Sequence, residues 1–155
     1  MMIGEAAGLM GVRAPDGVLI RRLTDEADML AAARMADEVF GGPGIAETLA
    51  HDLARRIAAG DPLEMWAAEA DGHIVSAGRI DPIPGTDVAG IRGGATRPEY
   101  RGRGIYRALT SARVESVMRH GVRYIHSDST EDSRPILERS GLVKVSETTP
   151  WTWTR

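Results

Sequence analysis

Arginine and glycine are concentrated in one short stretch of the chain, residues 96–108, which reads Thr-Arg-Pro-Glu-Tyr-Arg-Gly-Arg-Gly-Ile-Tyr-Arg-Ala. Gly102 and Gly104 have no Cβ, so the backbone N–H groups beside them can approach a ligand closely and converge on it. Three arginines nearby add full positive charges: Arg101, Arg103 and Arg107. Convergent N–H groups and guanidinium charges are typical of a site for an anion such as a pyrophosphate.

The residues around this stretch predict a strand before it and a helix after it. Residues 88–95 form an apolar run broken by glycines, and from Ile105 onward apolar residues recur at helical spacing. The glycine-rich turn is therefore expected where a strand gives way to a helix. A helix start carries about half a positive charge, which adds to the attraction for an anion.

The spacing within the stretch argues against two common phosphate-binding loops. A Walker A loop contains Gly-Lys-Ser or Gly-Lys-Thr, and residues 96–108 include no lysine. A dinucleotide-binding loop reads Gly-x-Gly-x-x-Gly, but Arg107 stands where its third glycine belongs. The pattern that remains is Arg/Gln-x-x-Gly-x-Gly/Ala, which Arg101 and Gly104 match, while Tyr106 occupies its last place.

Preceded by Pro98, Glu99 and Tyr100, this pattern resembles the acetyl-CoA loop of the GNAT superfamily of N-acetyltransferases. The resemblance implies acetyl-CoA as co-substrate, with its pantetheine arm in an opening beside a bent strand at 88–96. It also implies that a backbone N–H near Ala95 or Thr96 polarises the thioester carbonyl. The cofactor-binding residues expected on this basis are Gly94, Ala95, Thr96, Arg101, Gly102, Arg103, Gly104, Ile105, Tyr106, Arg107 and Ser133.

The order of predicted elements along the chain is similar to that of the same family. Strands are expected at 18–23, 63–70, 73–80, 88–96, 122–127, 142–147 and around Trp151 and Trp153, and helices from Thr24 to 40, over 45–57, after Gly104 and after Ser133. Asp71 and Gly72 predict a two-residue hairpin turn. Residues 1–17 are expected to be a flexible leader, and 18–155 a single domain.

The fold class that we expect is α/β (α+β), a GNAT fold with a mixed central sheet of six to seven strands and four helices. Its N-terminal strands should be antiparallel. The strands on either side of the acetyl-CoA loop should form a parallel pair, because a helix intervenes between them. Gly90, Gly93 and Gly94 predict a bulge or a close approach of a ligand in the strand before the loop.

Composition excludes several classes of function. The 19 basic and 22 acidic residues give a net charge of −3, which argues against nucleic-acid binding. There are no cysteines, so an acyl-cysteine intermediate is excluded, and acyl transfer should be direct or use another nucleophile, of which we expect direct transfer. The four histidines lack ligand spacing, so no metal is expected. The start of the chain is too short to span a bilayer and has no basic n-region, so no membrane contact and a cytoplasmic location are expected.

Transfer of an acetyl group to an amine needs a deprotonated amine, a polarised carbonyl and a proton for the departing thiolate. The candidate bases are Glu69, Asp81, His126 and Asp128, of which Asp128 has the best expected location. Three of them also have a structural interpretation: Glu69 as a solvated strand residue, His126 as a hydrogen-bonded core histidine and Asp128 as a turn residue.

The chain departs from the family at two places. Many members carry a tyrosine as general acid where this chain has Leu137, so a water or another hydroxyl such as Ser129 or Tyr124 must serve, or acyl-CoA is bound without turnover. Tyr106 either narrows the pyrophosphate site or turns outward and adds a hydroxyl contact.

The acceptor pocket is expected to be lined by residues 40–45, Trp151 and Trp153, with a small-molecule or peptide amine as acceptor. Paired tryptophans can stack on an aromatic or cationic acceptor, but two at strand spacing more often belong to a core or to the seam of a homodimer.

Overall fold

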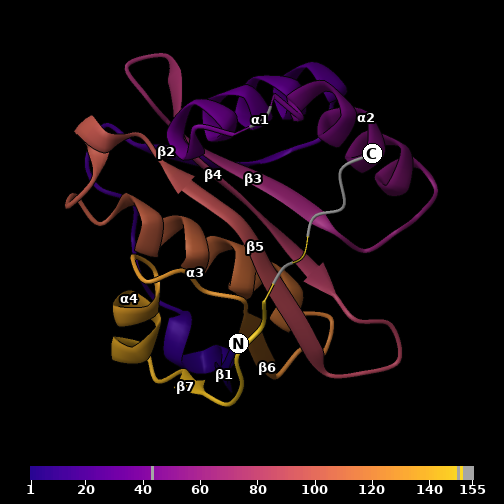
Figure 1. Ribbon diagram of the computed structural model, residues 1–155, viewed down its shortest axis with the longest axis vertical. Helices are drawn as coiled ribbons and strands as arrows, with labels where there is room; N and C mark the ends of the chain where they lie inside the picture. The colour runs from indigo at the N-terminus through magenta and orange to yellow at the C-terminus, as the bar shows by residue number, and fades with distance from the viewer. Residues whose placement is uncertain (43, 150, 152–155) are drawn as a thin grey trace.

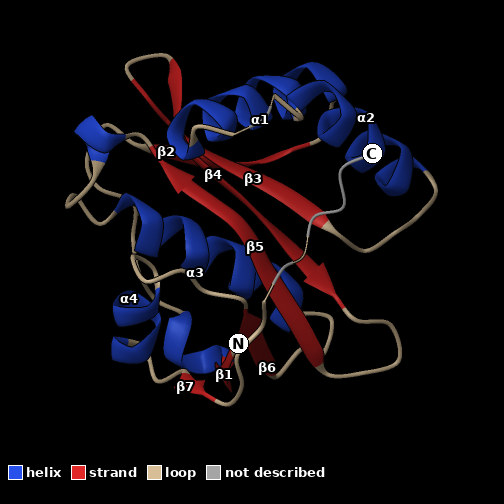
Figure 2. Ribbon diagram, in the orientation of Figure 1, coloured by secondary structure: helices blue, strands red, loops and turns tan. Residues whose placement is uncertain are grey.

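The computed structural model describes residues 1–42, 44–149 and 151, which form a seven-stranded sheet with helices on both faces (Figures 1 and 2). The strands are β1 (Met2–Glu5), β2 (Leu19–Leu23), β3 (Glu64–Ala70), β4 (His73–Pro82), β5 (Val88–Thr96), β6 (Tyr124–Ser127) and β7 (Val143–Lys144). The α-helices are α1 (Glu26–Phe40), α2 (Ala46–Ala58), α3 (Ile105–Met118) and α4 (Arg134–Arg139), and two 3-10 helices are η1 (Ala6–Leu9) and η2 (Pro98–Tyr100). The sheet order is β2-β3-β4-β5-β6-β1-β7.

Two apolar cores lie on opposite faces of the sheet. On one face Ala77 of β4 packs with Met29 of α1 and Leu53 of α2. On the other face Ile80 of β4 packs with Val114 and other residues of α3. Side chains three residues apart on a strand point to opposite faces, so β4 contributes to both cores. The end of β5 contributes Ala95 to the first core, and the start of α3 contributes Ile105 to a third, smaller cluster with Ala68 and Val75.

The hairpin between β3 and β4 confirms the turn expected from the sequence. Asp71 and Gly72 both have positive φ, 53° and 75°. Such a pair of values is what a two-residue turn of type I′ requires, and Asp-Gly tolerates it. The antiparallel set β2–β3–β4–β5 and the parallel pair β5–β6 are likewise as expected.

The prediction of a flexible leader over 1–17 is wrong for residues 2–9. Strand β1 lies inside the sheet, antiparallel to both β6 and β7, and η1 follows it. Met2 and Ala6 are almost fully buried. A Cβ on Gly4 would lie 2.9 Å from Cα of Leu142, so the glycine permits close packing. A four-residue strand whose two large apolar side chains are adjacent, Met2 and Ile3, is too short to show a period, which explains the error.

Several element ends also differ from the sequence predictions. Helix α1 is capped by Asp25 and not by Thr24, because the Asp25 carboxylate accepts a hydrogen bond from the N–H of Asp28 at 2.9 Å. Strand β7 covers only Val143–Lys144 and not 142–147, because it pairs only with Met2 and Ile3 of the short β1. Trp151 is 91% exposed and outside any strand, while Trp153 lies outside the described residues.

None of the helices in the described part of the chain is long and apolar enough to cross a membrane.

Candidate functional site

Strand β5 runs on past the end of β6, and this leaves one edge of its second half without a neighbouring strand. The parallel ladder covers only Val88–Gly90 of β5 and then ends. On its other side β5 stays with β4, but Gly93 and Gly94 together face the single residue Gly78, which is a β-bulge. Gly93 has φ 60°, a value that favours glycine. The bulge predicted from these glycines is confirmed, and the second half of β5 presents backbone groups that the β6 ladder does not use.

The loop between β5 and α3 places backbone N–H groups at that open end. Gly102 and Gly104 have φ values of 73° and 82°, and Gly104 occupies the N-cap position of α3. No side chain in the described part of the chain caps this helix start. Its first N–H groups are therefore available to a ligand.

The arginines of the loop are exposed, and two of them are held in place. Nε of Arg101 donates to the carbonyl oxygen of Thr96 at 3.1 Å, which ties the loop to the end of β5. The Arg103 guanidinium lies 5.0 Å from the ring centre of Tyr100. Tyr100 in turn donates to Asp71 of the hairpin at 3.1 Å. The loop thus offers positive charge on a fixed backbone, as an anion site requires.

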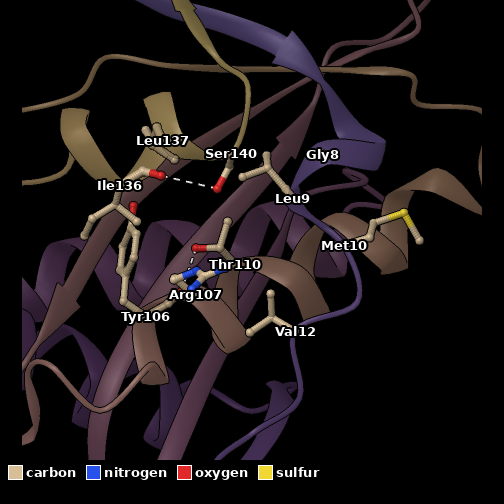
Figure 3. A pocket seen from close by; sticks show the side chains of 10 residues that line it. All are labelled: Gly8, Leu9, Met10, Val12, Tyr106, Arg107, Thr110, Ile136, Leu137 and Ser140. Atoms are coloured by element: carbon tan, nitrogen blue, oxygen red, sulfur yellow. Dashed lines mark hydrogen bonds between the residues drawn. The ribbon is translucent and has the colours of Figure 1, made fainter.

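Tyr106 does not turn outward from the first turn of α3. Its ring lies back over β5, where a Cβ on Gly94 would be 2.8 Å from Cε2 and 3.6 Å from the hydroxyl oxygen of Tyr106. Gly94 is thus needed for the packing of this tyrosine. Figure 3 shows Tyr106 reaching from α3 toward Ile136 and Leu137 of α4.

A small pocket of about 60 Å³ lies between α3, α4 and η1 (Figure 3). Its walls include Tyr106 and Arg107 from α3, Leu137 from α4 and Leu9 from η1. Leu137 is 1% exposed and belongs to the apolar core. The hydroxyls that line this pocket therefore belong to Tyr106 and Thr110 of α3 and to Ser140 at the end of α4, and not to position 137.

On the opposite face of the sheet, His126 lies at the point where β5 and β6 separate. Its Nε2 would be 2.7 Å from a Cβ on Gly90, and its Nδ1 is buried without a partner among the described residues. Burial, followed by the Arg92 charge, lowers the pKa of His126, while Asp128 and Asp81 oppose this. The imidazole is therefore neutral near pH 7 and able to accept a proton.

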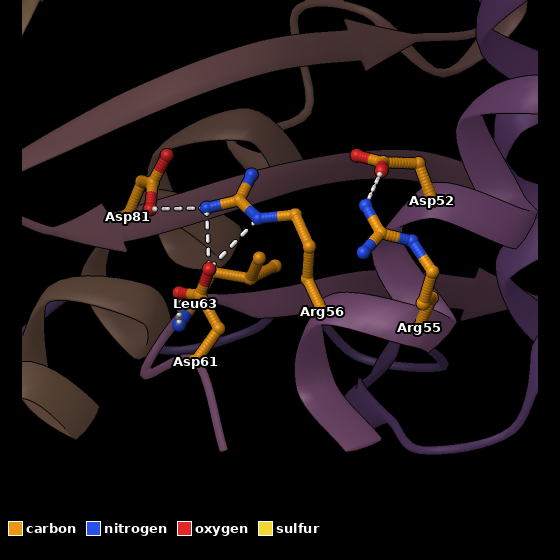
Figure 4. A network of polar contacts seen from close by, with 6 residues as sticks. All are labelled: Asp52, Arg55, Arg56, Asp61, Leu63 and Asp81. Atoms are coloured by element: carbon orange, nitrogen blue, oxygen red, sulfur yellow. Dashed lines mark hydrogen bonds and ion pairs between the residues drawn. The ribbon is translucent and has the colours of Figure 1, made fainter. Parts of the chain in front are cut away.

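The carboxylates near His126 are held by arginines. Nη1 of Arg92 lies 3.8 Å from Oδ2 of Asp128. Asp81 lies 3.5 Å from Nη2 of Arg56, which also holds Asp61 at 2.7 Å (Figure 4). Asp81 is thus part of an ion-pair network between β4 and the end of α2.

Glu69 lies in a different place from the other candidate bases. It pairs with Leu19 of β2 in the sheet, and its Oε1 lies 2.7 Å from Nη2 of Arg21. The structure brings His126, Asp128 and Asp81 together around the opening, but it places Glu69 in an ion pair on the far side of β4.

The acetyltransferase (GNAT) family model matches residues 29–141, more than half of the chain. The chain belongs to the acetyltransferase (GNAT) family. No curated protein matches its sequence.

Solved structures of GNAT proteins share the fold at low sequence identity. An acetyltransferase of Trypanosoma brucei has a TM-score of 0.71 at 20% identity, covering 88% of this chain and 99% of its own. A predicted acetyltransferase of Clostridium acetobutylicum, solved with acetyl-CoA, has a TM-score of 0.69 at 19% identity over 89% and 96%. AAC(6')-Iy, solved with the bisubstrate analogue CoA-S-monomethyl-acetylneamine, has a TM-score of 0.68 at 20% identity over 89% and 98%.

The expected residues of the GNAT cofactor site gather at the open end of the sheet, but not all of them present side chains there. Ile105 is 1% exposed and packs with Ala68 and Val75, so only its backbone faces the loop. Ala95 is buried against the α1 and α2 side. Ser133 at the start of α4 accepts a hydrogen bond from the N–H of Thr130 at 3.1 Å and is exposed only in part.

One residue that sequence reasoning missed is Arg113 of α3, which is 0% exposed. It follows Leu109 by four residues and Ile105 by eight, so it lies on the apolar face of the helix. A charged residue at a position of the apolar face can be recognised in the sequence, and it could have indicated a buried arginine. Among the described residues no group of three or more His, Asp or Glu is placed to hold a metal ion.

Proposed function

We propose that this GNAT protein is an N-acetyltransferase that moves the acetyl group of acetyl-CoA directly onto a primary amine of a small molecule or peptide. One observation carries the proposal: the second half of β5 has left β6 and leads into a glycine-bounded loop that opens α3. The opening offers a strand edge for the pantetheine arm. The loop offers N–H groups and exposed arginines for the pyrophosphate.

The backbone of β5 beyond the bulge would polarise the thioester carbonyl. Oγ of Ser76 donates to the carbonyl oxygen of Ala95 at 2.8 Å and lies 2.8 Å from Oγ1 of Thr96. These buried contacts fix the strand to β4. A fixed N–H near Ala95 or Thr96 can then stabilise the oxyanion without reorganisation.

His126 is the candidate for the base that receives the amine proton. It lies beside the opening, its neutral form is favoured by burial, and Asp128 and Arg92 flank it. The amine nitrogen would attack the carbonyl carbon, its proton would pass to the imidazole directly or through a water, and the thiolate would leave. The chain has no cysteine, which supports transfer without an acyl-cysteine intermediate. The CoA thioester is an intracellular metabolite, which supports a cytoplasmic location.

A second candidate function is a non-catalytic acyl-CoA-binding module or sensor. The observation in its favour is Leu137, an apolar core residue where many GNAT enzymes carry an acidic hydroxyl. Both candidates bind the cofactor, so binding alone does not separate them.

The experiment that separates the two functions is a panel of primary amines incubated with acetyl-CoA. Free thiol is followed by colour and the products by mass. The panel includes aminoglycosides, because the similar structure AAC(6')-Iy was solved with an acetylneamine analogue. An acetylated amine formed above the uncatalysed rate supports the transferase. Binding of acetyl-CoA without turnover of any amine supports the module, and absence of binding contradicts both.

A further inference from the structure

The departing thiolate needs a proton, and the hydroxyl of Tyr106 lies beside the part of β5 that is expected to hold the thioester. This inference rests on the proposed acetyl transfer. The N–H groups expected to polarise the carbonyl belong to the residues that follow Gly94 on β5. The Tyr106 hydroxyl lies directly over Gly94, on the side where α3 faces the sheet. Since sulfur and carbonyl carbon are bonded neighbours in a thioester, a hydroxyl at Gly94 is within reach of the sulfur.

The second observation is a guanidinium buried without a counter-ion. Arg113 is fully buried, and its pKa is lowered by that burial, an effect that the nearby Tyr106 oxygen opposes. It donates to the carbonyl oxygens of Leu109 at 3.3 Å and Arg79 at 3.0 Å, and to Oγ1 of Thr110 at 2.9 Å. No carboxylate pairs with it among the described residues. Charges buried this deeply are normally paired, so a lone guanidinium in the core requires an explanation.

Arg113 and Tyr106 meet at the β-bulge, and the backbone is shaped to receive both. A Cβ on Gly78 would overlap Nη1 of Arg113, just as a Cβ on Gly94 would press on Tyr106. Gly78 is the residue of β4 that faces Gly93 and Gly94. Thr110 also joins the pair, because its hydroxyl donates to the carbonyl oxygen of Tyr106 at 2.8 Å while it accepts from Arg113.

We propose that Tyr106 is the proton donor to the departing thiolate and that Arg113 is the positioning residue that holds the Tyr106 oxygen and faces the negative charge it acquires. The C–S bond breaks with its electron pair on sulfur, and the Tyr106 proton passes to that sulfur to give the free thiol. The phenolate formed lies beside the guanidinium and regains a proton from solvent after the products leave. The acid missing at Leu137 of α4 is thus supplied from α3.

The first test compares Tyr106→Phe with Tyr124→Phe in the amine acetylation assay. Loss of the Tyr106 hydroxyl should lower kcat by about 10²-fold, the usual size of a lost general acid, with the KM for acetyl-CoA unchanged. Tyr124 is the competing tyrosine hydroxyl, but it pairs with Val88 and Glu5 at the closed end of β6, so Tyr124→Phe should lower kcat far less than Tyr106→Phe, and the reverse order would overturn the assignment. Wild-type kcat in Tyr106→Phe would overturn the assignment. If that variant also bound acetyl-CoA more tightly, the tyrosine would only obstruct the opening.

The second test asks whether Arg113 acts through its charge. Arg113→Lys and Arg113→Met are compared at matched temperatures below both melting points, with acetyl-CoA affinity measured by calorimetry. The lysine variant should retain at least a tenth of the wild-type kcat, and the methionine variant should lose kcat to the level of Tyr106→Phe while binding acetyl-CoA normally. Equal kcat in the two variants would overturn the role of Arg113. Wild-type protein that acetylates no amine would instead overturn the proposed function itself.

Discussion

At the scale of single residues, the environment of His126 decides whether it can act as a base. Burial and Arg92 both disfavour its charged form, while Asp128 and Asp81 favour it. The sequence shows a histidine near the end of a strand, but the neighbours come from β4, β5 and the turn after β6. Only the folded sheet brings these charges to the ring.

We therefore predict opposite shifts of the His126 pKa in two variants. Arg92→Gln should raise the pKa, because a charge that lowers it is removed, and Asp128→Asn should lower it further. In the wild type the pKa of His126 should lie below the usual value of 6.5. If His126 is the base, kcat/KM should therefore decline on the acid side with a midpoint below pH 6.5. NMR titration of the imidazole measures these shifts. A wild-type pKa above 6.5, or variants that shift in the reverse directions, would exclude this account of the base.

Other residues show which features of the site can be predicted from the sequence alone. Gly93 of the bulge and Asp71-Gly72 are predictable, because the positive φ values they adopt are ones that few other residues tolerate. The direction of Tyr106 is not predictable, since it depends on Gly94 on a different element. Arg113 was missed because a single charged residue does not alter the apolar period of a helix.

At the scale of elements, β1 is the segment that sequence reasoning placed wrongly. Its pairing partners β6 and β7 lie more than a hundred residues away along the chain. Local periodicity contains no information about such pairing, whereas the β3–β4 hairpin is set by two adjacent residues. The long elements α1, α2, β4 and β5 were predictable because the pattern that identifies each of them lies within its own residues.

We predict that Gly4→Ala destabilises the protein and that Gly42→Ala does not. A Cβ on Gly4 would lie 2.9 Å from the backbone of Leu142, which cannot move without disturbing β1 and β7. Overpacking of this kind costs about 1–3 kcal/mol. The nearest atom to a Cβ on Gly42 is a side-chain oxygen at 3.4 Å. Urea unfolding of the two variants gives the difference in the free energy of unfolding, and equal values would mean that β1 is not packed as described.

At the scale of the whole molecule, the two cores explain why the site lies where it does. Both cores hold β4, through Ala77 and Ile80, and both hold β5, through Ala95 on the α1 and α2 side and through Ala89 and Ile91 on the α3 side. Beyond the bulge, β5 has β4 as a neighbour but no longer β6. The opening therefore results from the pairing of β4, β5 and β6 together. From the sequence it was expected because of the glycines of β5 and the GNAT order of elements.

Two glycine variants separate binding at the loop from stability of the whole molecule. Gly104 and Gly85 have similar positive φ values, 82° and 77°, and a Cβ on either would meet open space. Alanine at each position should cost a similar amount of stability, about 1–2 kcal/mol, since only the backbone conformation is disfavoured. Gly104→Ala should also weaken acetyl-CoA binding by about tenfold, or 1.4 kcal/mol, whereas Gly85→Ala in the β4–β5 turn should not.

The most direct measurement is isothermal titration of acetyl-CoA and of free CoA into the wild-type protein. If backbone N–H groups at the start of α3 hold the pyrophosphate, both ligands should give saturable heats with one site per chain, and a pantetheine fragment without the diphosphate should bind far more weakly. An absence of heat with acetyl-CoA and CoA, or equal affinity for the fragment, would contradict the account.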